Sequence, residues 1–175
     1  MSQAYKHVEW CIKKAKKEIE ESKNLGKSPK HKGLLEIKPS TEEAKKHILK
    51  AEHNLKAVAK FKEIGFSDWS IAAVFYSIYH CFLAIAFKFG YESKNQTCTI
   101  ALIEYLQENG KINIDKKFID ILKYSDMGID ISKVIEMREE YTYGVDIAFD
   151  DTTKIEDLIK TCKDIIFITK NIIYK

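Results

Sequence analysis

A single arginine, Arg138, raises the first chemical question in this sequence. It lies in the segment IEMREEYTYGVD (135–146) and is the only arginine among the 29 lysine and arginine residues of the chain. A guanidinium is planar and carries its N–H donors in a fixed fork, so it binds phosphate or carboxylate at two points, which a lysine ammonium cannot do. The chain therefore places a group suited to anion recognition at this one position.

Arg138 also interrupts a pattern of apolar residues. These recur at helical spacing, and residue 138 fills the gap in a series formed by Ile131, Val134, Tyr141 and Val145. The pattern predicts a helix over 131–145 with a charge on its apolar stripe, which is costly unless a partner or a wet cleft receives it. Two interpretations stay open. One is a structural ion pair, or a stem along the stripe with its head in water. The other is a guanidinium presented to a phosphate or carboxylate in a cleft or dimer interface.

A second group of polar side chains lies in FYSIYHCF (75–82). Tyr76 and His80 are i,i+4 neighbours, and Tyr79 is beside them in sequence. A tyrosine and a histidine inside an apolar helix need hydrogen-bond partners, so a satisfied polar core network is one interpretation. The other is that His80 faces a cleft as a general acid or base, since its unperturbed pKa of about 6.5 suits that role.

Metal and cofactor sites have little support in the sequence. His7 and Cys11 are i,i+4, but no second pair accompanies them, and His47 and His53 lie on different helix faces. The chain has no Gly-rich phosphate loop, no Gly-x-Ser-x-Gly and no His-Glu-x-x-His. We therefore expect no metal and no cofactor.

The cysteines and the apolar segments indicate a cytoplasmic protein. Cys11, Cys81, Cys98 and Cys162 are far apart, with no Cys-x-x-Cys spacing, and are predicted to be buried free thiols in a reducing compartment. There is no signal peptide. The longest apolar stretch, 69–89, contains Ser, Tyr, His and Lys, which favours a buried core helix over a membrane span. We expect no membrane partner.

Composition and periodicity predict that helices position these residues. The chain is 45% hydrophobic and 31% charged, with only seven glycines and two prolines, fewer than turn-rich β folds usually need. No segment shows clean period-two alternation. The expected fold class is all-α, an antiparallel bundle of about five core helices plus an N-terminal helix. The predicted helices cover 4–23, 41–64, 68–89, 97–108, 115–125, 131–145 and 153–173.

Local signals mark the helix starts and a division of the chain. Ser40 begins a capping box with Glu43, Ser67 is predicted to cap the next helix, and a second capping box is predicted at Thr153 with Glu156. Residues 1–39 are expected to be an N-terminal extension and 40–175 the helical domain. The extension ends in the basic loop GKSPKHKG (26–33), either a solvated linker or an anion-binding finger. The net charge of +3 is too small to identify a nucleic-acid binder.

The order of these segments resembles the HEPN domains of prokaryotes. The run AEHNLKAVAKF through GFSDWSIAAVFYSIYHCFLAIAFKFGYESKNQ (51–96) is followed by REEYTYG (138–144). The resemblance covers about 40–175, and the N-terminal extension is similar to that of an archaeal subgroup. The positions that match the family pattern are Asn54, Leu55, Asp68, Tyr76, His80, Gly90, Lys94 and Arg138.

The resemblance implies an all-α bundle that usually dimerises. Many members are metal-independent ribonucleases, several are toxins, and many are encoded beside a small nucleotidyltransferase. In the ribonuclease members an arginine is followed four to six residues later by histidine, and two subunits together form the site. By this resemblance Arg138 would hold a phosphate, with Asp68, Tyr76 and Lys94 as further binding residues.

The chain departs from the ribonuclease pattern after Arg138, because no histidine follows in the expected window. Tyr143 takes the nearest place, and with a pKa of about 10 a tyrosine is a poor base at neutral pH. We therefore expect a homodimer that binds RNA, a nucleotide or a minimal nucleotidyltransferase partner around Arg138, within a toxin–antitoxin or defence module. The alternative is a metal-independent ribonuclease that uses Arg138 with His80 or Tyr143.

Overall fold

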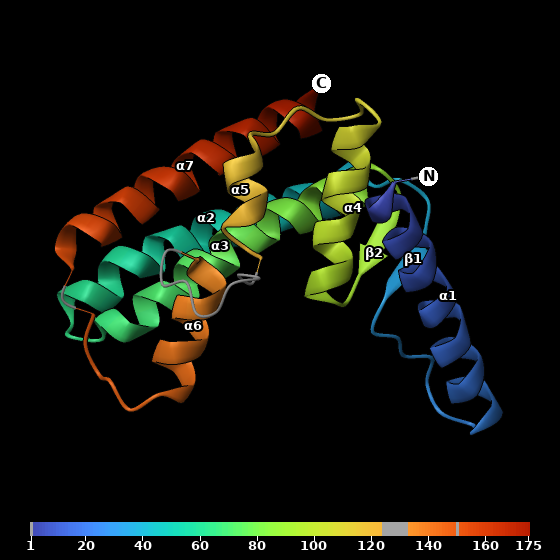
Figure 1. Ribbon diagram of the computed structural model, residues 1–175, viewed down its shortest axis with the longest axis horizontal. Coiled ribbons are helices and arrows are strands. Elements are labelled where there is room, and N and C mark those ends of the chain that lie inside the picture. Colours follow the sequence, from blue (N-terminus) through green and yellow to red (C-terminus); the bar gives the residue numbers. More distant parts are fainter. Residues whose placement is uncertain (1, 124–132, 150) are drawn as a thin grey trace.

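The protein is an all-α bundle with one small sheet, which confirms the predicted fold class (Figure 1). The computed structural model describes residues 2–123, 133–149 and 151–175, and Thr152 by its backbone alone. Within these residues the elements are α1 (Gln3–Asn24), β1 (Leu34–Glu36), α2 (Thr41–Glu63), α3 (Ser67–Lys88), β2 (Tyr91–Ser93), α4 (Gln96–Glu108), α5 (Lys116–Asp120), α6 (Val134–Tyr143) and α7 (Thr152–Tyr174).

Helix α3 is the central helix, in contact with α2, α4, α6 and α7. Two serines on it, Ser70 and Ser77, donate hydrogen bonds to the backbone oxygens of Val58 (2.9 Å) and Ala51 (3.0 Å) on α2, so small side chains let the two helices approach closely. By length and composition α3 is apolar enough to cross a membrane, but 72% of its apolar window is buried inside the fold. This burial fits the core helix predicted from the sequence.

The start of α2 is fixed against the end of α3. Ser40 Oγ accepts a hydrogen bond from the Glu43 N–H at 3.2 Å, as the capping box predicts. The Glu43 carboxylate does not return to the cap amide as predicted. It accepts from Lys46 at 2.7 Å, and the Ser40 N–H donates to the Phe87 backbone oxygen at 3.0 Å. The cap thus also joins two helices.

Two predicted caps are wrong. Ser67 is already helical in α3 and does not cap it; its Oγ accepts the Phe149 N–H at 2.7 Å and so holds the loop before α7. Helix α7 is capped by Asp151, whose carboxylate accepts the Lys154 N–H at 2.9 Å, and not by Thr153. At Ser67 the competing group is the Phe149 N–H, and at α7 it is the Asp151 carboxylate; each replaces the cap that the local sequence predicts.

The N-terminal extension is joined to the bundle by a sheet that the sequence did not reveal. β1 pairs antiparallel with β2, with Leu34 opposite Ser93, and α1 packs on α4 and on β1. Each strand has only three residues, too few to show period-two alternation. The two strands are stabilised by pairing with each other, although they are far apart in sequence. Residues 34–36 and 91–93 are therefore strands that no alternation in the sequence predicts, and the fold remains all-α apart from them.

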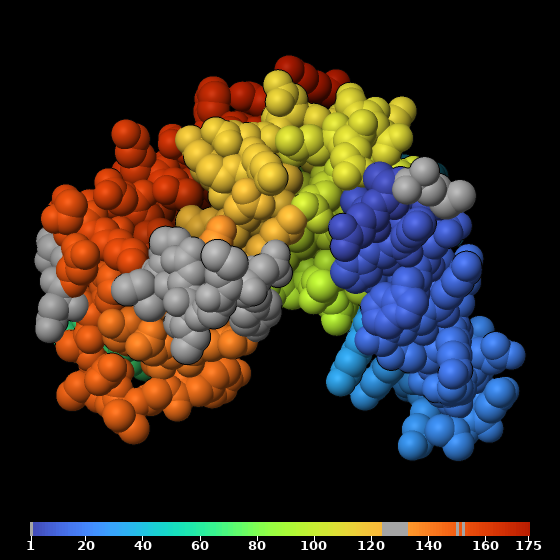
Figure 2. Space-filling model, viewed as in Figure 1, coloured from blue at the N-terminus to red at the C-terminus, as the bar shows by residue number. Residues whose placement is uncertain are grey.

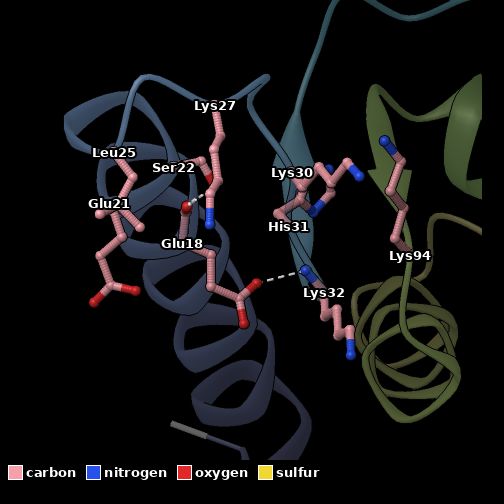
Figure 3. A pocket seen from close by; sticks show the side chains of 9 residues that line it. All are labelled: Glu18, Glu21, Ser22, Leu25, Lys27, Lys30, His31, Lys32 and Lys94. Atoms are coloured by element: carbon pink, nitrogen blue, oxygen red, sulfur yellow. Dashed lines mark hydrogen bonds between the residues drawn. The ribbon is translucent and has the colours of Figure 1, made fainter.

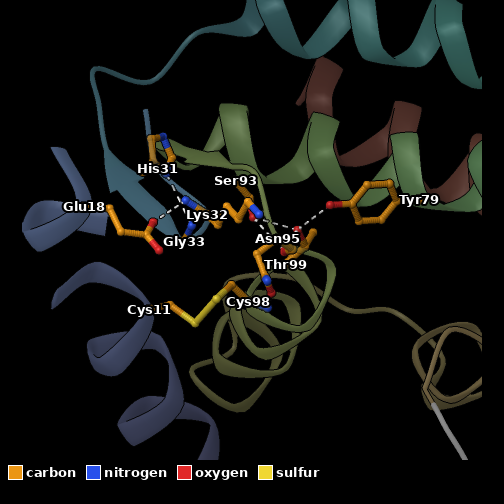
Figure 4. Close-up of a disulfide and its surroundings, with 10 residues drawn as sticks. All are labelled: Cys11, Glu18, His31, Lys32, Gly33, Tyr79, Ser93, Asn95, Cys98 and Thr99. Carbon is orange, nitrogen blue, oxygen red and sulfur yellow. Dashed lines mark hydrogen bonds between the residues drawn. A yellow bond between two sulfur atoms is a disulfide. The ribbon is translucent and has the colours of Figure 1, made fainter. Parts of the chain in front are cut away.

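A disulfide also joins the extension to the bundle, which corrects the prediction of four free thiols. Cys11 on α1 is bonded to Cys98 on α4, and both side chains are fully buried (Figure 4). Cys81 and Cys162 are buried free thiols, as predicted. The prediction failed for Cys11 and Cys98 because they are 87 residues apart, and sequence spacing says nothing about their contact in the fold.

The molecule has the outline of an arch. In Figure 2, α1 and the following loop form one end and α6 with the start of α7 the other, with a hollow between the two ends. Helices α1 and α6 are thus far apart in this view (Figure 1).

Candidate functional site

Helix α6 presents Arg138 to the central helix. It is shorter than predicted, Val134–Tyr143, and packs on α3. Val134 and Met137 are buried, so the apolar stripe is real at this end. Val145 lies beyond the helix and is 94% exposed, so its predicted place on the apolar stripe is wrong. Ile131, the first residue of the predicted stripe, lies outside the described residues.

The Arg138 guanidinium lies on an aromatic ring. Its Cζ atom is 4.3 Å from the centroid of the Phe75 ring on α3, a cation–π contact. One terminal nitrogen is 3.2 Å from the Glu139 carboxylate, and the arginine side chain is 17% exposed. Its Nε is buried and has no hydrogen-bond partner among the described residues. The charge is therefore held in place by packing, with part of its donor set unused.

Tyr76 contacts the same ring, and Asp68 lies two helical turns before it on α3. The Tyr76 ring meets the Phe75 ring edge-on at 5.2 Å and is 45% exposed. Asp68 precedes Phe75 by seven residues, two helical turns, and so shares its face of α3. Its Oδ1 is buried without a hydrogen-bond partner among the described residues. Three predicted binding residues, Arg138, Tyr76 and Asp68, therefore belong to one face, formed by α3 and α6.

His80 belongs to a different group of side chains. Its Nδ1 is 2.9 Å from the Nδ1 of His47 on α2, and the His47 ring stacks on Phe87. Burial, with His47 and Lys50 nearby, lowers the pKa of His80 to about 4. His80 follows Phe75 by five residues, roughly 140° around the helix. The structure does not bring His80 to Arg138.

Tyr143 and Lys94 also lie apart from the guanidinium. Tyr143 is at the last position of α6 and is 80% exposed. Lys94 follows β2, and its Nζ lies 2.7 Å from the Glu92 carboxylate. In Figure 1, α6 and β2 are on opposite sides of α4, so Lys94 and Arg138 do not share a site.

Tyr79 makes part of the polar network expected inside α3. Its hydroxyl is 3.1 Å from Thr99 Oγ1, and Thr99 in turn donates to Ser93 Oγ at 2.7 Å (Figure 4). Burial raises the pKa of Tyr79. This network connects α3, α4 and the end of β2, and it has no contact with Arg138 among the described atoms.

The comparison with protein families identifies the bundle. The family model of the HEPN domain matches residues 44–172, from α2 to near the end of α7. The chain belongs to the HEPN family. HEPN domains often dimerise and bind RNA, and they occur in toxin–antitoxin systems. No curated protein sequence is significantly similar to this chain.

Within the HEPN domain, sequence reasoning missed Phe75, the residue that connects Arg138 to Tyr76. Phe75 is 2% exposed and stacks on Tyr79 at 5.8 Å as well as meeting Tyr76 and Arg138. A phenylalanine in an apolar helix gives no signal of its own, because most of its neighbours are also core residues. Its role follows only from the packing of α6 on α3.

A group of metal-ligating residue types on α1 and α4 includes both cysteines of the disulfide. The ligand atoms of His7, Cys11 and Cys98 lie within 4.8 Å of one another. In the disulfide neither sulfur is a thiolate, and a thiolate is the form that binds a metal. His7 is thus left as a single ligand in this state.

Proposed function

We propose that the face formed by α3 and α6 binds single-stranded RNA, with Arg138 as its phosphate contact. The observation that carries this proposal is the Arg138 guanidinium, fixed on the Phe75 ring with its Nε unpartnered among the described residues. In line with the family, the protein acts as a homodimer in a toxin–antitoxin or defence setting.

The donor geometry of Arg138 supports a phosphate ligand. A guanidinium has five N–H donors, and the described contact to Glu139 uses one terminal nitrogen. Glu139 is 41% exposed and adjacent in sequence, so solvent weakens this pair. Because Phe75 holds the guanidinium plane, a phosphate meets donors that are already oriented.

Exposed aromatic residues on α3 support a nucleic-acid ligand over a simple anion. Tyr76 is 45% exposed and Trp69, seven residues before it on the same side of α3, is 50% exposed. Bases of a single strand stack on such rings whatever their sequence. The face thus combines a phosphate contact with two stacking surfaces.

The binding test is fluorescence anisotropy with a labelled RNA of about 12 nucleotides, close to the site sizes of single-strand binders. Arg138→Met keeps the side-chain length and removes the fork, and we expect it to weaken binding about tenfold. Lys160→Met, on the exposed side of α7, removes the same charge and is the matched control. Equal losses in the two variants would show that only net charge matters and would overturn the proposal.

A second measurement tests the stacking surface. The chain has two tryptophans, Trp10 on α1 and Trp69 on α3, so Trp10→Phe leaves Trp69 as the only indole. We expect RNA to quench the Trp69 emission in this variant, and Trp69→Ala to weaken binding by about 1–3 kcal/mol. RNA binding with unchanged Trp69 emission would place the strand elsewhere.

The same samples distinguish binding from cleavage. If the protein is a metal-independent ribonuclease, RNA incubated with chelator shortens on a gel, and Arg138→Met abolishes the shortening. The separation of Arg138 from His80 and the exposure of Tyr143 favour binding within one chain. Binding of a nucleotidyltransferase partner with no RNA affinity would overturn the RNA assignment.

Exposed apolar side chains support the homodimer. Ile64 and Phe66, in the turn between α2 and α3, are 63% and 52% exposed. The Phe149–Ser67 hydrogen bond brings the loop with Ile147, 81% exposed, to the same end of the bundle. We expect sedimentation velocity to show a dimer and Phe66→Glu to shift it toward monomer. A wild-type monomer at all concentrations would remove the homodimer from the proposal.

A further inference from the structure

The N-terminal extension forms a basic pocket away from the Arg138 face. It has a volume of about 650 Å³ and lies between the end of α1, the loop after it and the segment after β2 (Figure 3). Four lysines line it, Lys27, Lys30, Lys32 and Lys94, and they come from two parts of the chain that are far apart in sequence. Two glutamates of α1, Glu18 and Glu21, also line it, so the lysines outnumber the carboxylates by two. The volume is in the range of small-molecule sites.

The loop that carries three of these lysines is fixed in place. The Lys32 N–H donates to the Glu18 carboxylate on α1, and the Lys94 N–H donates to the Gly33 oxygen at 3.1 Å. Gly33 lies so close to α1 that an added Cβ would be 2.4 Å from the Cys11 oxygen. The backbone around the pocket is therefore held before any ligand arrives, which lowers the entropy cost of binding.

The lysines of this loop lack negative partners. Within the described residues, no carboxylate forms an ion pair with Lys27, Lys30 or Lys32, and the Glu18 oxygen nearest the loop already accepts the Lys32 N–H. Lys94 is paired with Glu92 at 2.7 Å. Several ammonium groups facing one cavity repel one another, and a multivalent anion removes that repulsion.

A buried histidine supplies a further ligand group. The His31 side chain is only 4% exposed and lines the pocket. Its Nδ1 accepts the Gly33 N–H at 3.4 Å, which leaves Nε2 to carry the proton in the neutral ring. Nε2 is buried with no hydrogen bond among the described residues, and the nearest carboxylate oxygen, of Glu92, is 3.8 Å away. Such an unsatisfied donor is costly and needs an acceptor.

We infer that this pocket binds an oligophosphate chain, either free or as the tail of a nucleotide. The lysines neutralise successive phosphate groups, and the buried His31 lies beside them in the lining. Leu25, 68% exposed at the pocket wall, offers an apolar contact to a nucleobase. The site is separate from the Arg138 face and does not depend on the proposed RNA binding.

The test is isothermal titration calorimetry of the full chain with tripolyphosphate, ATP and inorganic phosphate at matched ionic strength. Lys27→Gln with Lys30→Gln removes two exposed charges from the pocket, so the fold should survive. The matched control is Lys160→Gln with Lys163→Gln on α7, which removes the same charge from two exposed positions elsewhere. Circular dichroism checks that both variants keep the wild-type helix content.

We expect saturable binding of tripolyphosphate and ATP at one site per chain, with inorganic phosphate weaker. The pocket variant should lose about tenfold in affinity or more, and the control should lose less than about twofold. If ATP binds more tightly than tripolyphosphate, the ligand is a nucleotide whose nucleoside is also recognised. If the two affinities are equal, the pocket recognises the phosphate groups alone. No saturable binding, or equal losses in pocket variant and control, would overturn the inference. Arg138→Met should leave this binding unchanged, so failure here and failure of RNA binding remain distinguishable.

Discussion

The Nδ1 atoms of His47 and His80 face each other at 2.9 Å between α2 and α3. Two neutral imidazoles satisfy this contact, since one Nδ1 donates and the other accepts. Two protonated rings cannot, because both nitrogens would be donors. Burial lowers the pKa of both, most for His80, to about 4. A singly protonated pair still has one donor and one acceptor, so the first proton is opposed by burial of the charge rather than by loss of the hydrogen bond.

The pair predicts a loss of stability in mild acid. His80 has its pKa lowered from 6.5 to about 4 on folding, so between these values the unfolded chain binds more protons. The neutral His80 therefore makes its full contribution to the free energy of unfolding above about pH 6.5. This contribution, on the order of 1–3 kcal/mol, is lost as the pH falls toward 4. Urea unfolding across this range measures it. His80→Gln should flatten the slope, whereas His53→Gln, exposed on α2, should not; equal slopes in both variants would contradict the assignment.

Arg138→Met is expected to leave the free energy of unfolding unchanged or to raise it by up to about 1 kcal/mol. The thioether side chain can pack on Phe75, and the lost ion pair with the half-exposed Glu139 is weak. A buried structural ion pair would instead cost about 3–5 kcal/mol when one partner is removed. Urea titration of this variant and of Glu139→Gln therefore decides whether the arginine serves the fold or a ligand.

Thiol labelling should find two reactive cysteines in the denatured, unreduced chain. Cys81 and Cys162 are free, and Cys11 and Cys98 are bonded. Mass spectrometry after alkylation in denaturant should show two added groups without reductant and four with it. In the native state burial raises the pKa of both free thiols, that of Cys162 to about 12, so labelling should be slow. Four labelled cysteines without reductant would disprove the disulfide.

Gly33→Ala should destabilise the contact between the basic loop and α1 by about 1–3 kcal/mol, because its new Cβ would meet the Cys11 backbone oxygen at 2.4 Å. Gly26→Ala is the contrast. There an added Cβ meets nothing within 4 Å, and only the left-handed backbone, φ 65°, resists the change. Hydrogen exchange of the β1 amides measures the difference, and equal protection in both variants would contradict the close contact at Gly33.

Most of the helices could be predicted because their signals are local. On α2 the apolar residues that recur at alternating spacings of four and three are Ala44, Ile48, Ala51, Leu55 and Val58. All are buried except Leu55, which is partly buried and packs against the core. The helix caps were predicted less well. Ser67, for example, accepts a hydrogen bond from Phe149, which is 82 residues away and outside any local stretch of sequence around Ser67. The predicted division of the chain at residues 39 and 40 stays a prediction.

The long-range features could not be predicted from spacing. The β1–β2 ladder, the Cys11–Cys98 bond and the Arg138–Phe75 contact each join segments that only the folded chain brings together. Arg138 itself was found because a charge interrupts an apolar series, a local signal. Its ring partner was not found, because nothing in the sequence distinguishes Phe75 from other core aromatics. The basic loop was visible, but its convergence with Lys94 and with the buried His31 was not.

The covalent bond between α1 and α4 changes what a protease can do to this chain. A cut in the exposed loop between α1 and β1 would break the backbone, yet the severed helix would stay attached through Cys11 and Cys98. Only a reductant would then release it as a separate peptide. A nicked molecule would thus migrate as one species on a non-reducing gel and as two on a reducing one.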